Sequence, residues 1–238
     1  MKIHDVVQGS PDWLRVRMGK PTASNFHILL TTTGKISKAQ GVTDYRNFLL
    51  AEMLTGSPII KKESEWMEHG KEVEPEAAEA YELVKDCRVQ TVGFVTNDAE
   101  TIGCSPDRLV GDDGLLQIKC PAPWTHVGYM MGDELTTKYK AQVQGELLIA
   151  EREWCDVMSY HQQMPTAIYR VGRDEEFIAM LSEALNAFVE DMQRSIEALT
   201  ERYGPKVIAA HKTKKKRLPS GETAYDIYGG LHEEDLKV

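Results

Sequence analysis

The sequence lacks an excess of positive charge, long apolar runs and closely spaced pairs of cysteines. It contains 28 Lys and Arg against 37 Asp and Glu, a formal net charge of −9. This balance argues against a protein that coats nucleic acid through bulk positive charge, but it allows a local basic groove. No stretch approaches the length of a membrane span, and the first residues contain no basic region followed by a long apolar run. We therefore expect no signal peptide, no membrane contact and a cytosolic (cytoplasmic) location.

Cysteine is scarce as well. The four cysteines lack the close spacing of a zinc site; they are Cys87, Cys104, Cys120 and Cys155. Without a secretion signal we expect them to be reduced and buried rather than disulfide-bonded. A set of four scattered ligands for an iron–sulfur cluster is the alternative.

The chain is long enough to form one globular domain with a substantial core. It has 238 residues, of which 42% are hydrophobic, and neither its charge nor its Pro and Gly content suggests disorder. We expect a single domain over residues 1–205 and a C-terminal extension over residues 206–238. The one concentrated basic stretch, residues 211–217, lies in that extension and is predicted to be a solvated tail rather than a DNA contact.

The apolar pattern changes period several times along the chain. Spacing near 3.6 predicts four helical regions, at residues 44–56 (with Asp44 as N-cap), 64–84 (with Pro75 beginning a second helix or making a kink), 136–151 and 175–204. Alternating and β-branched patterns predict strands, three of them between residues 88 and 120 and two more at residues 153–161 and 167–173. This order predicts an α/β fold, a mixed sheet packed between helices.

The segment CSPDRLVGDDGLLQIKCP, residues 104–121, combines polar residues with a strand pattern. Strand alternation places Gln117 and Lys119 on one face and Leu116 and Ile118 on the other, towards the core. The intervening DDG is a hairpin signal, which folds Asp107 back beside Gln117. Oxygen atoms then gather near a lysine, and oxygen atoms are the ligands that Mg²⁺ prefers. An ordinary surface hairpin with solvated polar residues remains the alternative.

Four motifs in the chain resemble one family. CSPD, GLLQIK and CP resemble the metal motif C-S-P-D, hairpin, E-[L/I]-K-C-P of the phage lambda exonuclease family, the YqaJ-like viral recombination nucleases. The other three are RMGKPTAS, which resembles R-x-G-x-x-T-A-S, HGKEVEPEA, which resembles a G-K-x-x-E helix, and KYKAQVQ, which resembles a Y-x-A-Q-V-Q helix. Their common order over roughly residues 8–200 argues against coincidence.

The resemblance implies a restriction-endonuclease-like core with a central mixed β-sheet flanked by helices. It also implies a metal site that holds Mg²⁺, with two ions expected and Mn²⁺ able to substitute. Asp107 would share the metals, and Glu74 would approach from its helix. The Gln117 side chain and a backbone carbonyl, that of Ile118, would complete the protein ligands.

Other matched residues receive roles from the same resemblance. Lys119 would orient the attacking water and steady the charge on the phosphorus centre. Gln142 would help to position that water and Lys119, whereas Gln144, two residues further along the helix, should face elsewhere. Arg17 and Ser24 would hold the 5′-phosphate of the strand being cut, as guanidinium and hydroxyl groups suit phosphate oxygens. The alternatives are a surface ion pair for the arginine and a helix N-cap for the serine.

The resemblance implies an exonuclease that digests linear double-stranded DNA from a 5′-phosphorylated end towards 3′ and leaves a 3′ single-stranded overhang for recombination. It further implies a homotrimeric ring around the DNA and a single-strand annealing protein as partner. Two alternatives belong to other classes. One is a catalytically silent clamp on DNA ends; the other is a related junction resolvase or an iron–sulfur helicase-associated nuclease.

The chain departs from the family motif at Gln117, where the motif has glutamate. An amide keeps one carbonyl oxygen but removes a negative charge, so metal binding and activity should fall sharply while DNA binding need not. The amide is either an engineered substitution or a natural variant. We favour the first, since Asp107, Lys119, Glu74 and Gln142 are all intact.

Overall fold

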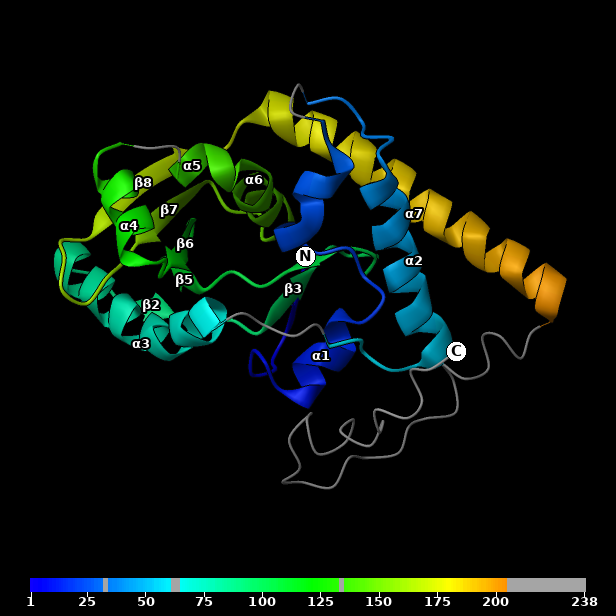
Figure 1. The fold of residues 1–238 in the computed structure, drawn as a ribbon, viewed down its shortest axis with the longest axis horizontal. Helices are drawn as coiled ribbons and strands as arrows, with labels where there is room; N and C mark the ends of the chain where they lie inside the picture. Colours follow the sequence, from blue (N-terminus) through cyan, green and yellow to red (C-terminus); the bar gives the residue numbers. More distant parts are fainter. Residues whose placement is uncertain (32–33, 61–64, 133–134, 205–238) are drawn as a thin grey trace.

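The computed structural model describes residues 1–31, 34–60, 65–132 and 135–204. They form a mixed α/β fold with two sheets (Figure 1). The smaller sheet is antiparallel, with the order β1 (Lys2–His4), β3 (Phe94–Thr96), β4 (Gly103–Cys104). The larger sheet has the order β2 (Val89–Gln90), β5 (Arg108–Val110), β6 (Gly114–Lys119), β7 (Trp154–Ser159), β8 (Ala167–Gly172). Its central pair, β6 and β7, is parallel and its other pairs are antiparallel. The expected mixed sheet flanked by helices is confirmed.

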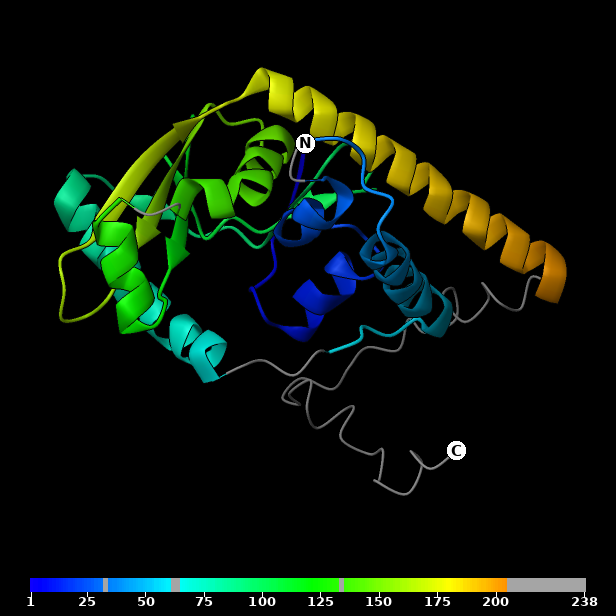
Figure 2. The same ribbon diagram turned by 45° about the horizontal axis from the view of Figure 1, so that its top comes forward.

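Helices surround the sheets. They are α1 (Pro11–Arg17), the 3₁₀ helix η1 (Ala23–Leu29), α2 (Gln40–Thr55), α3 (Glu65–Lys85), α4 (Pro123–Met130), α5 (Leu135–Lys138), α6 (Lys140–Ile149) and α7 (Glu175–Tyr203). The crossover from β6 to its parallel neighbour β7 contains α4, α5 and α6, as a parallel pair requires. Figure 2 shows the long α7 extending along one side of the molecule. No helix in the described part of the chain is long and apolar enough to cross a bilayer.

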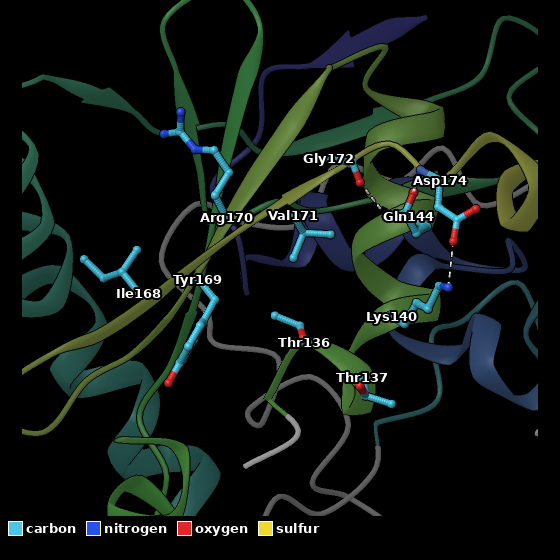
Figure 3. A pocket seen from close by; sticks show the side chains of 10 residues that line it. All are labelled: Thr136, Thr137, Lys140, Gln144, Ile168, Tyr169, Arg170, Val171, Gly172 and Asp174. Carbon is cyan, nitrogen blue, oxygen red and sulfur yellow. Dashed lines mark hydrogen bonds and ion pairs between the residues drawn. The ribbon is translucent and has the colours of Figure 1, made fainter. Parts of the chain in front are cut away.

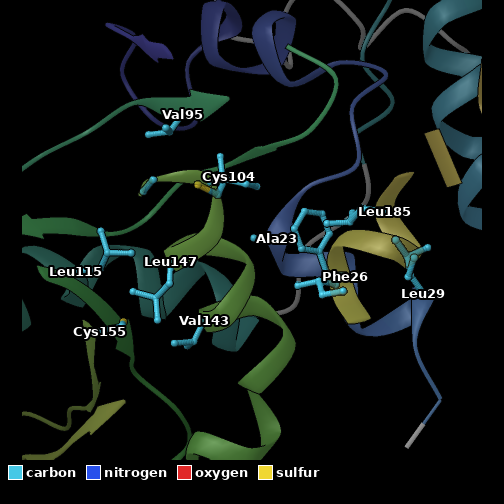
Figure 4. Close-up of a cluster of buried hydrophobic side chains, with 14 of the residues drawn as sticks. Ala23, Phe26, Leu29, Val95, Cys104, Leu115, Val143, Leu147, Cys155 and Leu185 are labelled. Atoms are coloured by element: carbon cyan, nitrogen blue, oxygen red, sulfur yellow. The ribbon is translucent and has the colours of Figure 1, made fainter. Parts of the chain in front are cut away.

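The core lies on both faces of the five-stranded sheet. On one face, Leu115 of β6 and Cys155 of β7 pack with Val143 and Leu147 of α6 (Figure 4). On the opposite face, Leu116 of β6 belongs to a second buried cluster that includes residues of α3. Strand β6 is therefore buried on both faces, which corrects the expected alternation between a core face and an exposed face. A parallel neighbour and covering helices on both sides explain the difference.

The region between residues 88 and 120 contains five strands rather than the three expected. The first predicted strand divides into β2 and β3, and the second divides into β4 and β5. In each case one half belongs to the larger sheet and the other half to the smaller sheet. A side chain at Gly93 would collide with the carbonyl of Val6, so the chain passes close to the N-terminal segment there. Pro106, between β4 and β5, has no N–H to donate to a ladder.

Two helix predictions need correction. Asp44 lies inside α2, which begins at Gln40, so the aspartate is not the N-cap. Helix α3 continues through Pro75, so this residue does not begin a second helix. The predicted closing glycine of α2 is confirmed, since Gly56 adopts the left-handed conformation there. The predicted tail and its basic stretch lie outside the described residues, and the boundary at residue 205 stays a prediction.

Candidate active site

The hairpin between β5 and β6 brings Asp107 beside Gln117, as the sequence predicts. The antiparallel register pairs Arg108 with Leu116. Asp107, which precedes Arg108, therefore lies beside Gln117, which follows Leu116. The Gln117 Nε2 atom donates a hydrogen bond of 2.6 Å to Asp107 Oδ2, and the backbone N–H of Ile118 donates another of 2.6 Å to the same oxygen. One carboxylate oxygen therefore receives two donors from β6.

Asp107 lies among charged groups of both signs. Burial raises the pKa of its carboxyl group to about 6; Lys119 acts in the opposite direction and Glu74 raises it further. Lys119, also on β6, holds its ammonium group 4.7 Å from the ring centre of Tyr139. The hairpin and the helix α3 thus bring three of the predicted site residues, Asp107, Lys119 and Glu74, within electrostatic reach of one another.

Glu74 reaches the site from α3 through an ion pair. Its Oε1 atom accepts a bond of 2.7 Å from Arg108 Nη1, which also donates to the backbone carbonyl of Asp107. Glu74, Asp107 and Arg108 line a cavity of about 700 Å³, which the segment from Asp5 to Gly9 also lines. The acidic cluster therefore opens to a space large enough for part of a substrate.

Gln142 contacts Glu146, and its role in positioning the water and Lys119 stays a prediction. Its Nε2 atom donates a bond of 2.8 Å to Glu146 Oε1, one turn further along α6. Gln144 faces elsewhere, as expected: it donates to the Gly172 carbonyl and accepts from the Asp174 backbone N–H. It lines a separate cavity of about 640 Å³ beside β8 (Figure 3).

Sequence reasoning missed Glu146. Its side chain is 1% exposed. Burial raises the pKa of Glu146 to about 8; the hydrogen bond from Gln142 and the charge of Lys119 lower it, and the charge of Asp107 raises it. The spacing was the available signal, because residues four apart share one helix face, so a helix that turns Gln142 towards the site turns Glu146 there too.

The donor set suits a hard divalent cation. Among the described residues, no three His, Cys, Asp or Glu side chains gather closely enough to hold a metal by themselves. The amide of Gln117 adds an oxygen, however, and this Oε1 atom is buried without a hydrogen-bond partner, as is Glu146 Oε2. Mg²⁺ binds carboxylate, amide and carbonyl oxygens and keeps several waters, so a few protein ligands suffice. The chemistry of these residues fits such an ion.

A second polar group of residues surrounds Arg17. Its Nη2 atom donates to Ser24 Oγ at 3.3 Å, and its guanidinium group lies 4.8 Å from the ring centre of Trp13. The indole N–H of Trp13 donates to Ser105 Oγ at 2.9 Å, two residues before Asp107. Sequence reasoning gave Trp13 and Ser105 no role in the site. They connect the predicted phosphate residues to the predicted metal motif.

Both alternatives for the Arg17–Ser24 pair are corrected. Ser24 lies inside η1, whose N-cap is Thr22, so it is not a cap. Arg17 forms no ion pair within the described residues. Burial lowers its pKa, and it lines a cavity of about 420 Å³ together with Lys20, whose pKa burial also lowers. The cavity is also lined by Glu52, whose carboxylate accepts from the backbone N–H groups of Gly19 and Ile59. Two cations against this one acid favour an anionic ligand.

The cysteines divide between the two faces of the large sheet. All four are free thiols. Cys104 and Cys155 belong to the core cluster under α6, whereas Cys87 and Cys120 pack against the cluster under α3. Two of them are thus buried and two partly buried. This separation argues against a common iron–sulfur ligand set.

The sequence pattern of the YqaJ-like viral recombinase domain matches residues 12–153, more than half of the chain. The chain belongs to the YqaJ-like viral recombinase family. The match contains Arg17, Glu74, Asp107, Lys119 and Gln142. It confirms the resemblance inferred from the four sequence motifs.

Solved structures agree with this assignment. An alkaline exonuclease from Laribacter hongkongensis is 32% identical, with a TM-score of 0.73 over 80% of this chain and 96% of the other. The same values hold for its complex with dAMP. A phage related exonuclease from Haemophilus somnus 129PT, 15% identical with a TM-score of 0.60, shares the fold. No curated protein matches the chain. Membership of this family supports a nuclease that takes part in DNA recombination.

Proposed function

We propose that this YqaJ-like recombinase is a Mg²⁺-dependent exonuclease that digests linear double-stranded DNA from a 5′-phosphorylated end and leaves a 3′ single-stranded overhang. The observation that carries the proposal is the pair of adjacent sites, an oxygen cluster around Asp107 and a cationic cavity at Arg17, connected through Trp13 and Ser105. One site suits hydrolysis of a phosphodiester and the other suits the terminal phosphate.

The reaction connects the two sites. Water attacks the phosphorus between the first two nucleotides and the bond from phosphorus to O3′ breaks, so a 5′-mononucleotide leaves and the shortened strand carries a new 5′-phosphate. Each cut therefore regenerates the group that the Arg17 cavity would hold. A deoxynucleoside monophosphate is the class of compound bound by the Laribacter hongkongensis exonuclease in its complex with dAMP.

The residues of the chain have separate tasks in this reaction. Bound Mg²⁺ would polarise the phosphate and lower the pKa of water, with Asp107, the Gln117 amide, Glu74 and the Ile118 carbonyl as the proposed ligands. Lys119 would orient the water and stabilise charge on the phosphate oxygens. Arg17 and Ser24 would fix the strand end. Gln142 would position its neighbours, an effect that acts through its bond to Glu146.

The amide at Gln117 lowers the negative charge of this cluster relative to the family motif. If no other carboxylate replaces the motif glutamate, metal affinity and cleavage rate would be low. A silent end clamp would then be the better description. Tight binding to DNA ends without cleavage, both by this chain and by its Gln117→Glu variant, would select that function.

A homotrimeric ring that passes DNA to a single-strand annealing protein completes the proposal. The ring would explain repeated cutting by a chain of net charge −9, because only residues lining the channel need be basic. Helix α4 offers an apolar exposed face for contact between copies, with Trp124 71% and its C-cap Met131 82% exposed. Light scattering should give three times the chain mass, and a monomer at micromolar concentration would remove the ring.

The proposed function is tested with linear duplexes whose 5′ ends carry either phosphate or hydroxyl, each with Mg²⁺ or Ca²⁺. We expect release of 5′-mononucleotides from the phosphorylated end, slower digestion of the hydroxyl end and little digestion with Ca²⁺. Digestion from 3′ ends, or preference for branched DNA over linear ends, would refute it.

A further inference from the structure

Two buried oxygen atoms at the candidate active site have no hydrogen-bond partner. They are Oε1 of Gln117 and Oε2 of Glu146, and among the described residues no other buried side-chain nitrogen or oxygen is in this state. The residues are 2% and 1% exposed. Buried polar atoms are nearly always hydrogen-bonded, and an unpaired one costs roughly 1–3 kcal/mol. Two such atoms in one region of the chain call for a common explanation.

Both side chains occupy the same layer of the protein. Gln117 lies on the face of β6 that also presents Leu115, and Leu115 packs in one cluster with Val143 and Leu147 of α6. Glu146 is the helix neighbour of these two apolar residues. Glu146 is shielded from solvent, and the charges of Asp107 and Lys119 both act on its carboxyl group, so it lies within electrostatic reach of the oxygen cluster.

The fold holds Glu146 in place. Gln142 fixes one carboxylate oxygen, Oε1, with a bond of 2.8 Å and leaves Oε2 unpaired. Gly145 allows α6 to approach η1 closely, since a side chain there would collide with the ring of Phe26. No described cation pairs with Glu146 through a salt bridge. A buried carboxylate that has neither a cation nor a full set of donors is costly in its charged form, and a bound cation would remove this cost.

We propose that Glu146 of α6 supplies the metal-binding carboxylate that Gln117 of β6 lacks. In this arrangement the acidic group has moved from the strand to the facing helix, and the amide contributes only its carbonyl oxygen. The charge of the cluster is then the same as with a glutamate at position 117. The chain is consequently an active metal-dependent protein rather than a disabled one, and Gln117 is a natural residue of its site.

This inference rests on the proposed function for the identity of the bound ion, but binding of the ion can be measured without DNA. The probe is Mn²⁺, titrated calorimetrically into the metal-free chain, its Glu146→Gln variant and the double variant Gln117→Glu/Glu146→Gln. Glu183→Gln, an exposed change on α7, is the matched control.

Changes around a protein metal typically cost roughly 10- to 100-fold in affinity, and we expect at least that loss for Glu146→Gln. The double variant, which returns the carboxylate to the strand, should bind Mn²⁺ as the parent does, and so should Glu183→Gln. Thermal unfolding in chelator serves as a folding control. There Glu146→Gln should be about as stable as the parent, because the amide keeps the size of the side chain and an oxygen that accepts from Gln142.

The outcomes separate the two proposals. Equal Mn²⁺ affinity of Glu146→Gln and the parent, or failure of the double variant to recover affinity, overturns the role of Glu146 even if the parent digests DNA. Loss and recovery of Mn²⁺ binding in a chain that digests no DNA supports Glu146 and refutes the nuclease proposal alone. If Glu146→Gln does not fold, Glu146→Asp takes its place: it keeps a carboxylate but shortens the side chain, so Mn²⁺ affinity equal to that of the parent would overturn the role of Glu146.

Discussion

Gln117 Nε2 donates a hydrogen bond of 2.6 Å to Asp107 Oδ2, the same oxygen that accepts from the backbone of Ile118. This contact occupies one oxygen of the aspartate and leaves the carbonyl oxygen of the amide without a partner. An amide can donate to a carboxylate through its NH₂ group and at the same time offer its carbonyl oxygen to a cation. The Gln117–Asp107 hydrogen bond therefore suits a metal site whose second carboxylate comes from a helix or strand other than β6.

The first prediction concerns Asp107. Asp107→Asn should lower both Mn²⁺ affinity and cleavage, by at least roughly 100-fold, the upper end for changes close to a protein metal. The fold should survive, because the amide oxygen can still accept from the Ile118 backbone. Calorimetry and digestion of a labelled duplex measure the two effects. Asp113→Asn, in the exposed turn of the same hairpin, should change neither.

The second prediction concerns recognition of the DNA end. Arg17→Ala should reduce the preference for a 5′-phosphate over a 5′-hydroxyl roughly 10- to 100-fold, because a charge-assisted hydrogen bond contributes about 1.5–3 kcal/mol. Arg15→Ala is the matched control on the same helix, since that residue pairs with Asp12 on the surface. Competition between the two ends in single-turnover digestion measures the preference. Equal loss in both variants would show a general effect of charge.

The third prediction concerns Gly145. Gly145→Ala places a methyl group against the ring of Phe26. Overpacking of this kind typically costs about 1–3 kcal/mol, so the free energy of unfolding should fall by that amount. Because α6 also carries Gln142 and Glu146, its displacement should weaken Mn²⁺ binding too. Urea unfolding measures the free energy of unfolding, and calorimetry measures Mn²⁺ binding. Ala141→Gly, which removes a methyl group from the same helix instead of adding one, is the comparison variant.

The fourth prediction concerns stability at acid pH. Burial acts to raise the pKa of Asp156, but hydrogen bonds from Arg170 and Tyr81 outweigh it and hold the pKa below its ordinary value. A lowered pKa means that Asp156 stabilises the fold above the ordinary aspartate pKa of about 4 and loses this effect as the pH falls through the folded value. Asp156→Asn should therefore lower the free energy of unfolding by roughly 1–3 kcal/mol at neutral pH.

At pH values well below the ordinary pKa the difference between Asp156→Asn and the parent should shrink, because the parent is then protonated as well. Urea unfolding across the acid range measures this convergence. A constant difference at all pH values would mean that lost packing, and not lost charge, causes the destabilisation. DNA cleavage should be unaffected, since Asp156 lies on the face of β7 away from Gln117.

Local chemistry made part of this site predictable. The turn between Asp107 and Gln117, the strand that carries Lys119 and the helix that carries Glu74 all follow from short-range patterns of polar, apolar and turn residues. The confirmed mixed sheet follows from the order of the elements. The division of residues 88–120 between two sheets was not predictable, because it depends on the close approach of the N-terminal segment to Gly93.

The spacing of Glu146 from Gln142 indicates a shared helix face, but it does not indicate whether that face is buried. In an amphipathic helix, a glutamate beside apolar residues is ordinarily assigned to the solvated edge. Here α6 is covered on several sides, by the sheet, by η1 and by α7, so its polar edge is buried as well. The packing of these elements buries Glu146 within electrostatic reach of Asp107. Trp13 and Ser105 were missed for a similar reason, since their contact joins segments 92 positions apart.

The most direct test of the account is the position of Mn²⁺ in crystals of the chain, located by anomalous diffraction. We predict an anomalous peak within ligand distance of the carboxylates of Asp107 and Glu146 and of the carbonyl oxygen of Gln117. A chain that binds Mn²⁺ only elsewhere, or that shows no peak beside Asp107 at saturating Mn²⁺, would contradict the account.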